Sequence, residues 1–133
     1  ISGPLLDRID LRVTVQNLGF EALGLSLGTE KAQVESSGQV RERVTQARKQ
    51  QWKRYAEEPG VQCNGLLNAE QTRRYCRLGE QALRFYQDAS ERLALSGRGL
   101  YRVLKVARTI ADLRKSPEIE IVDLSESLQF RQV

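Results

Sequence analysis

The fold is decided by residues 96–113, which read SGRGLYRVLKVARTIADL. Apolar side chains recur in this stretch at intervals of three and four residues: Leu100, Val103, Leu104, Ala107, Ile110 and Ala111. This spacing places them along one side of an α-helix, so it predicts an amphipathic helix with one buried side. Ser96 can cap the first turn, and Pro117 follows the last turn closely.

A second helix is predicted from Ser36 to about Tyr55. Ser36 and Gln39 have the spacing of a capping box, in which each side chain bonds a backbone N–H that the first turn leaves free. Residues 57–60, which read EEPG, end the helix. The residues expected along one side of it are Val40, Val44, Ala47, Trp52 and Tyr55.

Three shorter helices complete the expected bundle. One begins at Asn68, which forms a capping box with Gln71, and runs to about Arg77. The next follows Gly79, and the last spans roughly residues 121–131. The residues with core spacing in the last two helices are Ala82, Leu83, Tyr86, Ala89, Leu93, Leu124 and Leu128.

The N-terminal part of the chain follows other patterns. Residues 11–15, LRVTV, alternate apolar and polar side chains, which predicts a short β-strand. Residues 16–35 hold several glycines without a sustained period, so they are expected to form a loop or linker. The predicted fold is therefore mainly α: a bundle of about four to five helices over 36–133, preceded by one short strand.

Composition excludes several kinds of active site. The 133 residues include no His, which excludes His-based acid–base catalysis and His metal ligands. Two cysteines, Cys63 and Cys76, cannot make a zinc site alone, and their spacing leaves open whether they are oxidised. No G-x-x-x-x-G-K-[ST] motif occurs, so the chain is not a complete P-loop NTPase, and no metal site is predicted.

The chain also looks like part of a larger protein. It contains no Met and begins at Ile1, from which we expect a piece of a longer sequence. No apolar run approaches the roughly 18 residues of a membrane span, and no signal peptide is evident. A cytoplasmic location without membrane contact is therefore expected.

Positive charge gathers in one segment. The formal net charge is +4, whereas residues 96–115 alone carry six basic residues and one acidic residue. Such a segment favours an anionic neighbour, and phosphate is the obvious class.

Arg98 stands out within this segment. It lies in the first turn of the predicted helix, where the backbone dipole disfavours a cation, between the poor helix formers Gly97 and Gly99. Accessible backbone N–H groups beside a guanidinium suit a phosphate, so a nucleotide contact is one interpretation. A solvated arginine at a fraying helix start is the other.

Arg8 lies between Asp7 and Asp10, ahead of the predicted strand. An arginine between two carboxylates commonly forms a weak local ion pair. Its alternative role is that of an arginine finger, which neutralises charge developing on the γ-phosphate of a nucleotide held by a neighbouring subunit.

The other basic residues of the predicted helix face are Arg102, Lys105, Arg108 and Arg114. They form either a solvated helix face or a contact to a nucleic-acid backbone. Aromatic content is low, so Trp52 and the tyrosines are expected in the core or a groove rather than as base-stacking platforms.

Several segments together resemble the magnesium-chelatase-like AAA+ family that includes the ComM competence proteins. They cover nearly the whole chain outside 16–34, in the family's order. They are SGPLLDRIDL at 2–11, ESS at 35–37, VRERV at 40–44, AR at 47–48, RRYC at 73–76, LSGR at 95–98 and RVLKVARTIADL at 102–113.

The resemblance implies that residues 1–15 end an AAA+ core, that 16–35 link it onward, and that 36–133 form the C-terminal helical lid. In such enzymes ATP lies between core and lid, and a neighbouring subunit completes the site. The family's arginine finger corresponds to Arg8 and its sensor-2 arginine to Arg98. The parent would use ATP and Mg²⁺, form a homo-oligomeric hexameric ring and act on DNA in recombination or natural transformation. The isolated piece is expected to be monomeric, free of cofactor and catalytically silent.

Two alternatives stay open. The parent could be a magnesium-chelatase motor subunit that drives metal insertion into a porphyrin. Alternatively, the bundle could be a non-enzymatic module that binds DNA or protein through its basic 96–115 face.

Overall fold

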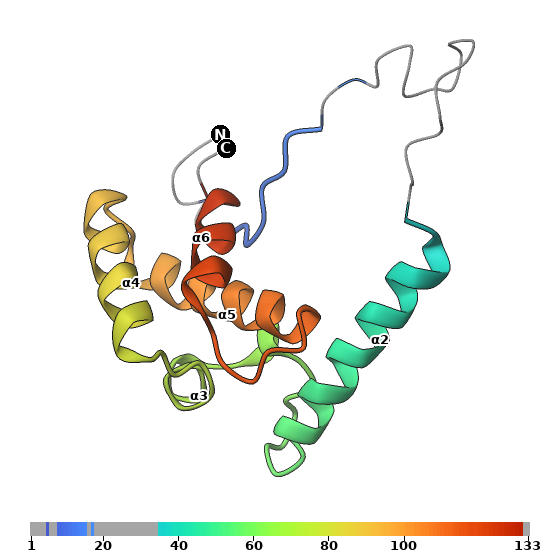
Figure 1. Cartoon of the computed structure of the whole chain (residues 1–133). Helices are drawn as coiled ribbons and strands as arrows, with labels where there is room; N and C mark the ends of the chain where they lie inside the picture. Colours follow the sequence, from blue (N-terminus) through green and yellow to red (C-terminus); the bar gives the residue numbers. More distant parts are fainter. Residues whose placement is uncertain (1–4, 6–7, 16, 18–34, 132–133) are drawn as a thin grey trace.

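The computed structural model of the chain describes residues 5, 8–15, 17 and 35–131. Within these residues it contains five α-helices and one short 3₁₀ helix (Figure 1). They are α2 (Ser37–Arg54), η1 (Asn64–Leu66), α3 (Ala69–Tyr75), α4 (Glu80–Arg92), α5 (Gly97–Leu113) and α6 (Ile121–Gln129). The predicted mainly helical bundle is confirmed.

The helix starts follow the predicted capping chemistry. The Ser36 hydroxyl accepts a hydrogen bond from the Gln39 backbone N–H at 3.3 Å, and the Ser36 N–H donates to the Gln39 amide oxygen at 2.8 Å. Asn68 and Gln71 make the same reciprocal pair at the start of α3. At α5, the Ser96 hydroxyl accepts from the Gly99 N–H at 3.0 Å. These bonds satisfy donors that a helix start otherwise leaves to water.

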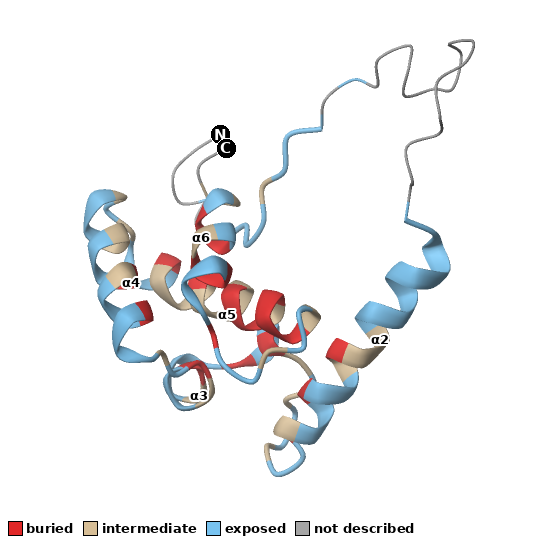
Figure 2. Cartoon of the chain, in the orientation of Figure 1, coloured by how far each residue is buried: buried red, intermediate tan, exposed pale blue. Residues whose placement is uncertain are grey.

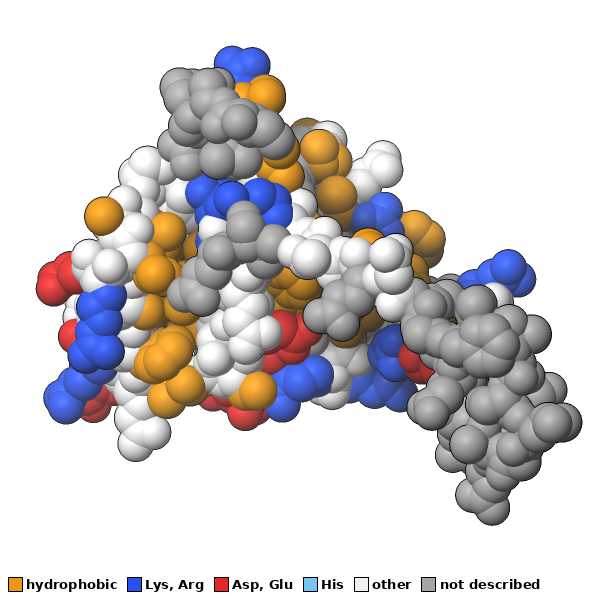
Figure 3. Space-filling view, turned by 90° about the horizontal axis from the view of Figure 1, so that it is seen from above, with side chains coloured by type: hydrophobic (Ala, Val, Ile, Leu, Met, Phe, Trp, Pro, Cys, Tyr) orange, Lys and Arg blue, Asp and Glu red, His pale blue; other side chains and the backbone are white. Residues whose placement is uncertain are grey.

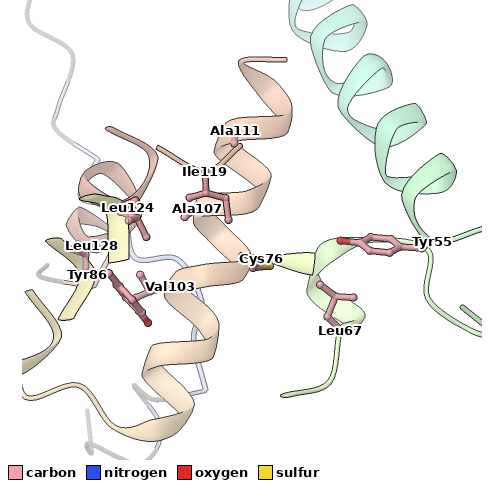
Figure 4. Close-up of a cluster of buried hydrophobic side chains, with 11 residues drawn as sticks. Tyr55, Leu67, Cys76, Tyr86, Val103, Ala107, Ala111, Ile119, Leu124 and Leu128 are labelled. Atoms are coloured by element: carbon pink, nitrogen blue, oxygen red, sulfur yellow. The ribbon is translucent and has the colours of Figure 1, made fainter. Parts of the chain in front are cut away.

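Helix α5 lies at the centre of the bundle and contacts α2, η1, α3 and α6, while α4 packs on α6. Its fully buried face consists of Val103, Ala107 and Ala111, which lie along one line of the helix (Figure 4). Leu124 and Leu128 of α6 point into the same core, as their spacing predicts. The small side chains of Ala107 and Ala111 let neighbouring segments approach α5 closely, and buried residues concentrate there (Figure 2).

Helix α2 joins the bundle only through its C-terminal half. Ala47 is its first buried residue, and Gln51 and the C-cap Tyr55 are buried after it. Residues 35–44 are all exposed, and this half of α2 extends away from the other helices (Figures 1 and 2). Val40 and Val44, expected on a buried side, are 39% and 46% exposed because the helix runs past the end of its contact.

The strand predicted at residues 11–15 does not form. These residues have no regular structure, and the β-pairing within the described part of the chain is limited to one isolated parallel bridge between Leu78 and Ile119. A strand needs a neighbouring strand to satisfy its backbone groups, and the described residues supply none beside 11–15. The segment lies against α6 instead, where the Arg12 N–H donates to the Phe130 carbonyl at 3.1 Å.

The proposed boundaries at 15 and 35 stay predictions, because most of the predicted linker, 16–35, lies outside the described residues. Across the residues that the structure places, none of the helices is long and apolar enough to cross a membrane.

Candidate functional site

Arg98 lies on the first turn of α5, as predicted, and its side chain is exposed. No hydrogen bond or ion pair joins its guanidinium to any other described residue, so it is available to a ligand. The Ser96 cap satisfies the Gly99 N–H and, through its carbonyl, the Leu100 N–H. A solvent-facing arginine thus stands beside the positive end of a capped helix.

The two glycines that flank Arg98 have different surroundings. A Cβ atom at Gly99 would lie 3.3 Å from the Ser96 hydroxyl oxygen and 3.4 Å from Nη2 of Arg131, so a side chain there would crowd the cap. Gly97 has open space around the position of a Cβ. Packing at the helix cap accounts for Gly99, whereas no contact within the described structure requires a glycine at 97.

Arg8 is exposed as well, and its backbone N–H donates to the Leu5 carbonyl at 3.0 Å. The neighbouring chain is held on the bundle: Nη1 of Arg131 donates to the Ile9 carbonyl at 3.0 Å. The Asp10 carboxylate pairs with Arg102 at 3.1 Å. Asp10 therefore pairs with α5 and not with Arg8. The Asp10–Arg102 pair holds the segment around Arg8 against α5, the helix that carries Arg98. No contact joins Arg8 to Arg98 themselves.

Arg102 and Lys105 line a pocket of about 260 Å³ between α5, α6 and the N-terminal segment. Its apolar wall includes Leu11, Ile110 and Phe130. The side chain of Arg102 is only 20% exposed beside Asp10, and Lys105 Nζ lies 3.3 Å from the Gly65 carbonyl oxygen, to which it donates. Both residues have partners within the chain, and their contact with nucleic acid stays a prediction.

A buried polar cluster around Asp112 joins α2, η1 and α5. The Asp112 carboxylate, in a residue 2% exposed, accepts from Arg54 Nη1 at 3.0 Å and Nη2 at 2.5 Å. It also accepts from Asn64 Nδ2 at 2.9 Å and from Arg108 Nε at 3.2 Å. Tyr55 donates its hydroxyl hydrogen to Asn64 Oδ1 at 2.6 Å. Two guanidiniums and one carboxylate are thus held together with most of their donors used.

The electrostatics of this cluster follow from burial and pairing. Burial raises the pKa of Tyr55 to about 12, against the opposing effect of the neighbouring Arg54. Burial by itself would lower the pKa of Arg54, but the hydrogen bonds to Asp112 and Tyr55 outweigh it and raise that pKa. Both residues therefore keep a fixed protonation state near neutral pH, as a structural cluster requires.

Sequence reasoning missed this cluster. It treated Arg108 as part of a solvated face, whereas Arg108 is 4% exposed and donates to the carbonyls of Ser116 and Pro117 at 2.7 and 2.9 Å. The signal that could have revealed part of it is the spacing of Arg108 and Asp112, which are four residues apart at the edge of the apolar stripe. Arg54 and Asn64 are far from Asp112 in sequence and give no local signal.

The two cysteines are free and differ in environment. Cys76 is buried in the core, and burial raises its pKa to about 11. Cys63 is half-buried at the N-cap of η1. Burial there acts to raise its pKa, but hydrogen bonds from Arg48 and from the backbone N–H groups of Leu66 and Gly65 outweigh it, so the pKa is lowered. The described residues include no group of three or more acidic or Cys side chains that could hold a metal ion.

Comparison with known proteins adds to this geometry. Residues 34–131 match the family described as "Magnesium chelatase, subunit ChlI C-terminal". The chain is 37% identical over 131 residues to the competence protein ComM of Haemophilus influenzae, which covers 98% of this chain and 24% of that protein. It is 34% identical over 133 residues to the uncharacterized protein YifB of Escherichia coli, covering 100% of this chain and 24% of YifB.

An uncharacterized Mycobacterium tuberculosis protein is 38% identical over 137 residues, covering 99% of this chain and 25% of that protein. The chain thus spans about a quarter of the length of the curated relatives that it matches.

Replacing Asp112 with Asn tests the buried cluster. The substitution keeps the shape of the side chain but leaves Arg54 and Arg108 without their shared anion, so we expect a loss of about 3–5 kcal/mol in unfolding free energy. Urea unfolding followed by circular dichroism measures it. Glu80→Gln breaks only an exposed pair with Arg84 and serves as the control, with little expected change. An Asp112→Asn variant as stable as the control would contradict the structural role.

Alkylation with iodoacetamide near neutral pH tests the two thiol environments. Because the pKa of Cys63 is lowered and that of Cys76 is raised, Cys63 has the larger thiolate fraction and should be modified first. Mass spectrometry of digested samples over time gives both rates, and Cys76 should react only when urea unfolds the chain. Arg48→Gln should slow the Cys63 reaction. Equal rates for the two cysteines in the folded chain would refute the assignment.

Proposed function

The chain belongs to the magnesium chelatase subunit ChlI C-terminal family, and from this premise we propose that it is the helical lid of an AAA+ ATPase that acts on DNA. The observation that carries the proposal is Arg98, which lies within the matched residues 34–131, exposed and without a partner among the described residues. Its position on the first turn of α5 suits a contact to the phosphates of a nucleotide.

ATP and Mg²⁺ belong to the parent protein in this proposal. The guanidinium of Arg98 is accessible, and its charge is not used elsewhere in the described structure, so the residue fits a sensor-2 role toward ATP. When bound, ATP supplies the phosphoanhydride whose cleavage drives the parent. The role of this chain is to bind and orient the phosphates. The lid alone is expected to be catalytically silent.

Arg8 is proposed as the arginine finger, which acts on the nucleotide of a neighbouring subunit. Its exposure and the pairing of Asp10 with Arg102 support this role, because the nearby Asp10 carboxylate is engaged with α5. A finger that works across a subunit interface requires an oligomer, and a homo-hexameric ring is proposed for the parent. The isolated chain is proposed to be monomeric.

The DNA substrate is proposed from the relative named a competence protein. Arg102 and Lys105 are proposed nucleic-acid contacts, for which phosphate oxygens would replace the Asp10 carboxylate and the Gly65 carbonyl. A cytoplasmic location is proposed for a parent that works on DNA with ATP.

Replacing Arg98 with Ala in the full-length parent tests the sensor-2 role. Loss of a charge-assisted contact worth about 1.5–3 kcal/mol should lower ATP turnover or affinity by roughly 10- to 150-fold, with the fold intact by circular dichroism. Steady-state ATPase assays over a range of ATP concentrations measure both quantities. Arg84→Ala, an exposed arginine on α4, is the matched control. Unchanged ATPase kinetics in the Arg98 variant would remove the sensor role.

Mixing subunits tests whether Arg8 acts across the interface. Arg8→Ala alone should lower the turnover by a factor on the order of 10³ or more. Mixed rings of Arg8→Ala and Arg98→Ala subunits should regain part of the activity, because some interfaces then combine an intact Arg98 with an intact Arg8 from the neighbour. A mixture no more active than its separate components would contradict the proposal, because it would show that both arginines reach a given site from the same subunit.

A second candidate is the motor subunit of a magnesium chelatase, which the name of the matched family favours. This parent would keep the same nucleotide contacts and drive metal insertion into a porphyrin. Deleting the gene distinguishes the two: loss of DNA uptake or recombination supports the first function, and accumulation of metal-free porphyrin supports the second. A gene located among tetrapyrrole genes would also support the magnesium-chelatase function.

A further inference from the structure

Helix α2 leaves more basic side chains without an ion pair than the 96–115 segment does. Three of the six basic residues in 96–115 form ion pairs: Arg102 with Asp10, Arg108 with Asp112, and Arg114 with Glu120 and Asp123. Viewed from above, Lys and Arg side chains are scattered over the bundle with Asp and Glu among them (Figure 3). The 96–115 segment is therefore less cationic toward a ligand than its composition predicts.

Helix α2 carries a similar excess of basic residues, but fewer of them form ion pairs. It contains six basic residues and a single acidic residue, Glu42. Arg43 pairs with Glu35, and Arg54 pairs with Asp112. The other four basic residues of α2 make no ion pair with any carboxylate in the described part of the chain: Arg41, Arg48, Lys49 and Lys53.

Three of these cations share one side of the helix with the chain's single tryptophan. Arg41, Arg48, Lys49 and Trp52 follow one another at i, i+7, i+8 and i+11, and we name these four residues the outer stripe. At 1.5 Å per residue the stripe is about 17 Å long. Trp52 is 55% exposed, and the Arg48 guanidinium lies 6.0 Å from the centre of its ring.

Three residues of the outer stripe, Arg41, Lys49 and Trp52, are exposed, whereas Arg48 is half-buried and donates a hydrogen bond to Cys63 at the start of η1. Other side chains of α2 line a pocket that they share with the end of α5. The pocket residues from α2 are Gln39, Glu42, Arg43 and Gln46, and those from the end of α5 are Leu113, Arg114 and Lys115. At 100° per residue, Arg41 and Trp52 lie on the side of α2 away from this pocket, whereas Lys49 lies about 20° around the helix from Glu42. The N-terminal half of α2 also extends clear of the other helices (Figure 1). Arg41 lies in this projecting half, and Lys49 and Trp52 lie exposed in the half that joins the bundle, so an elongated partner can contact all three.

We propose that the outer stripe of α2 docks the phosphate backbone of duplex DNA. Duplex DNA presents a rigid surface with one negative charge per about 1.7 Å of axis, which complements cations fixed along a straight helix. Arg48 covers one face of the Trp52 ring, which disfavours stacking of that ring between the bases of a single strand. A membrane-surface helix would need a broad apolar side, and Trp52 is the one large apolar residue of the stripe. The inference rests on the proposal that the parent acts on DNA.

Fluorescence of Trp52 provides the test on the present chain, without nucleotide. Titration with duplex DNA of mixed sequence at low salt should change the emission, because this tryptophan lies within the proposed contact. Anisotropy of labelled duplex gives the affinity, and three phosphate contacts predict a slope of log K against log salt of about −2.7. The affinity should therefore fall by roughly 40-fold between 50 and 200 mM salt.

Arg41→Gln, Arg48→Gln and Lys49→Gln combined should remove most of this slope. Arg77→Gln, Arg84→Gln and Arg92→Gln combined remove the same charge from exposed positions outside α2 and should leave the slope nearly unchanged. Circular dichroism checks that both triple variants are folded.

Four results would overturn the proposal: no binding at low salt, equal effects of the two triple variants, tighter binding of single-stranded DNA than of duplex, or binding of phosphatidylserine vesicles instead of DNA. None of them bears on Arg98 or Arg8, whose ATPase tests decide the lid assignment separately. A parent that hydrolyses ATP normally while its outer-stripe variant loses duplex DNA would separate the two functions.

Discussion

The rest of the structure depends on the carboxylate of Asp112. It lies in the last turn of α5 and holds Arg54 of α2, Asn64 of η1 and Arg108 of its own helix. A buried carboxylate is costly unless charged donors surround it, and here two guanidiniums and an amide do so. Because these donors come from three elements, the cluster fixes how the C-terminal end of α2 meets α5. Removing Asp112 would leave the guanidiniums of Arg54 and Arg108 without their shared anion.

The cluster around Asp112 explains how α2 is placed against the other helices. Helix α2 is fixed at Arg54 and at the buried C-cap Tyr55, while its first ten residues have no buried contact. The helix persists through that exposed half because the reciprocal bonds of Ser36 and Gln39 and the Arg43–Glu35 pair support its start. Arg41 can remain without an ion pair in this half because water solvates it, whereas the charges around Asp112 could not.

Local patterns predicted most of the fold and part of the site. Capping residues at Ser36, Asn68 and Ser96 located three helix starts, because a cap is read from residues three apart. The exposure of Arg98 likewise followed from a local conflict between a cation, two glycines and the helix dipole. The Arg54–Asp112 and Asp10–Arg102 pairs could not be predicted, because no spacing rule connects residues so far apart in the sequence. The strand at 11–15 was predicted wrongly for the same reason, because strand pairing is a long-range property.

The first turn of α5 contributes little to the stability of the helix, whereas its C-terminal half is packed in the core. Gly97 costs roughly 1 kcal/mol of helix stability relative to Ala, Gly99 is accounted for by packing at the cap, and Arg98 opposes the dipole. The C-terminal half offsets this cost through Val103, Ala107 and Ala111 in the core and through the Arg108–Asp112 pair. A first turn that was selected for stability alone would carry neither Gly97 nor Arg98. Because the buried half supports the helix, its first turn is free to present Arg98 to a ligand.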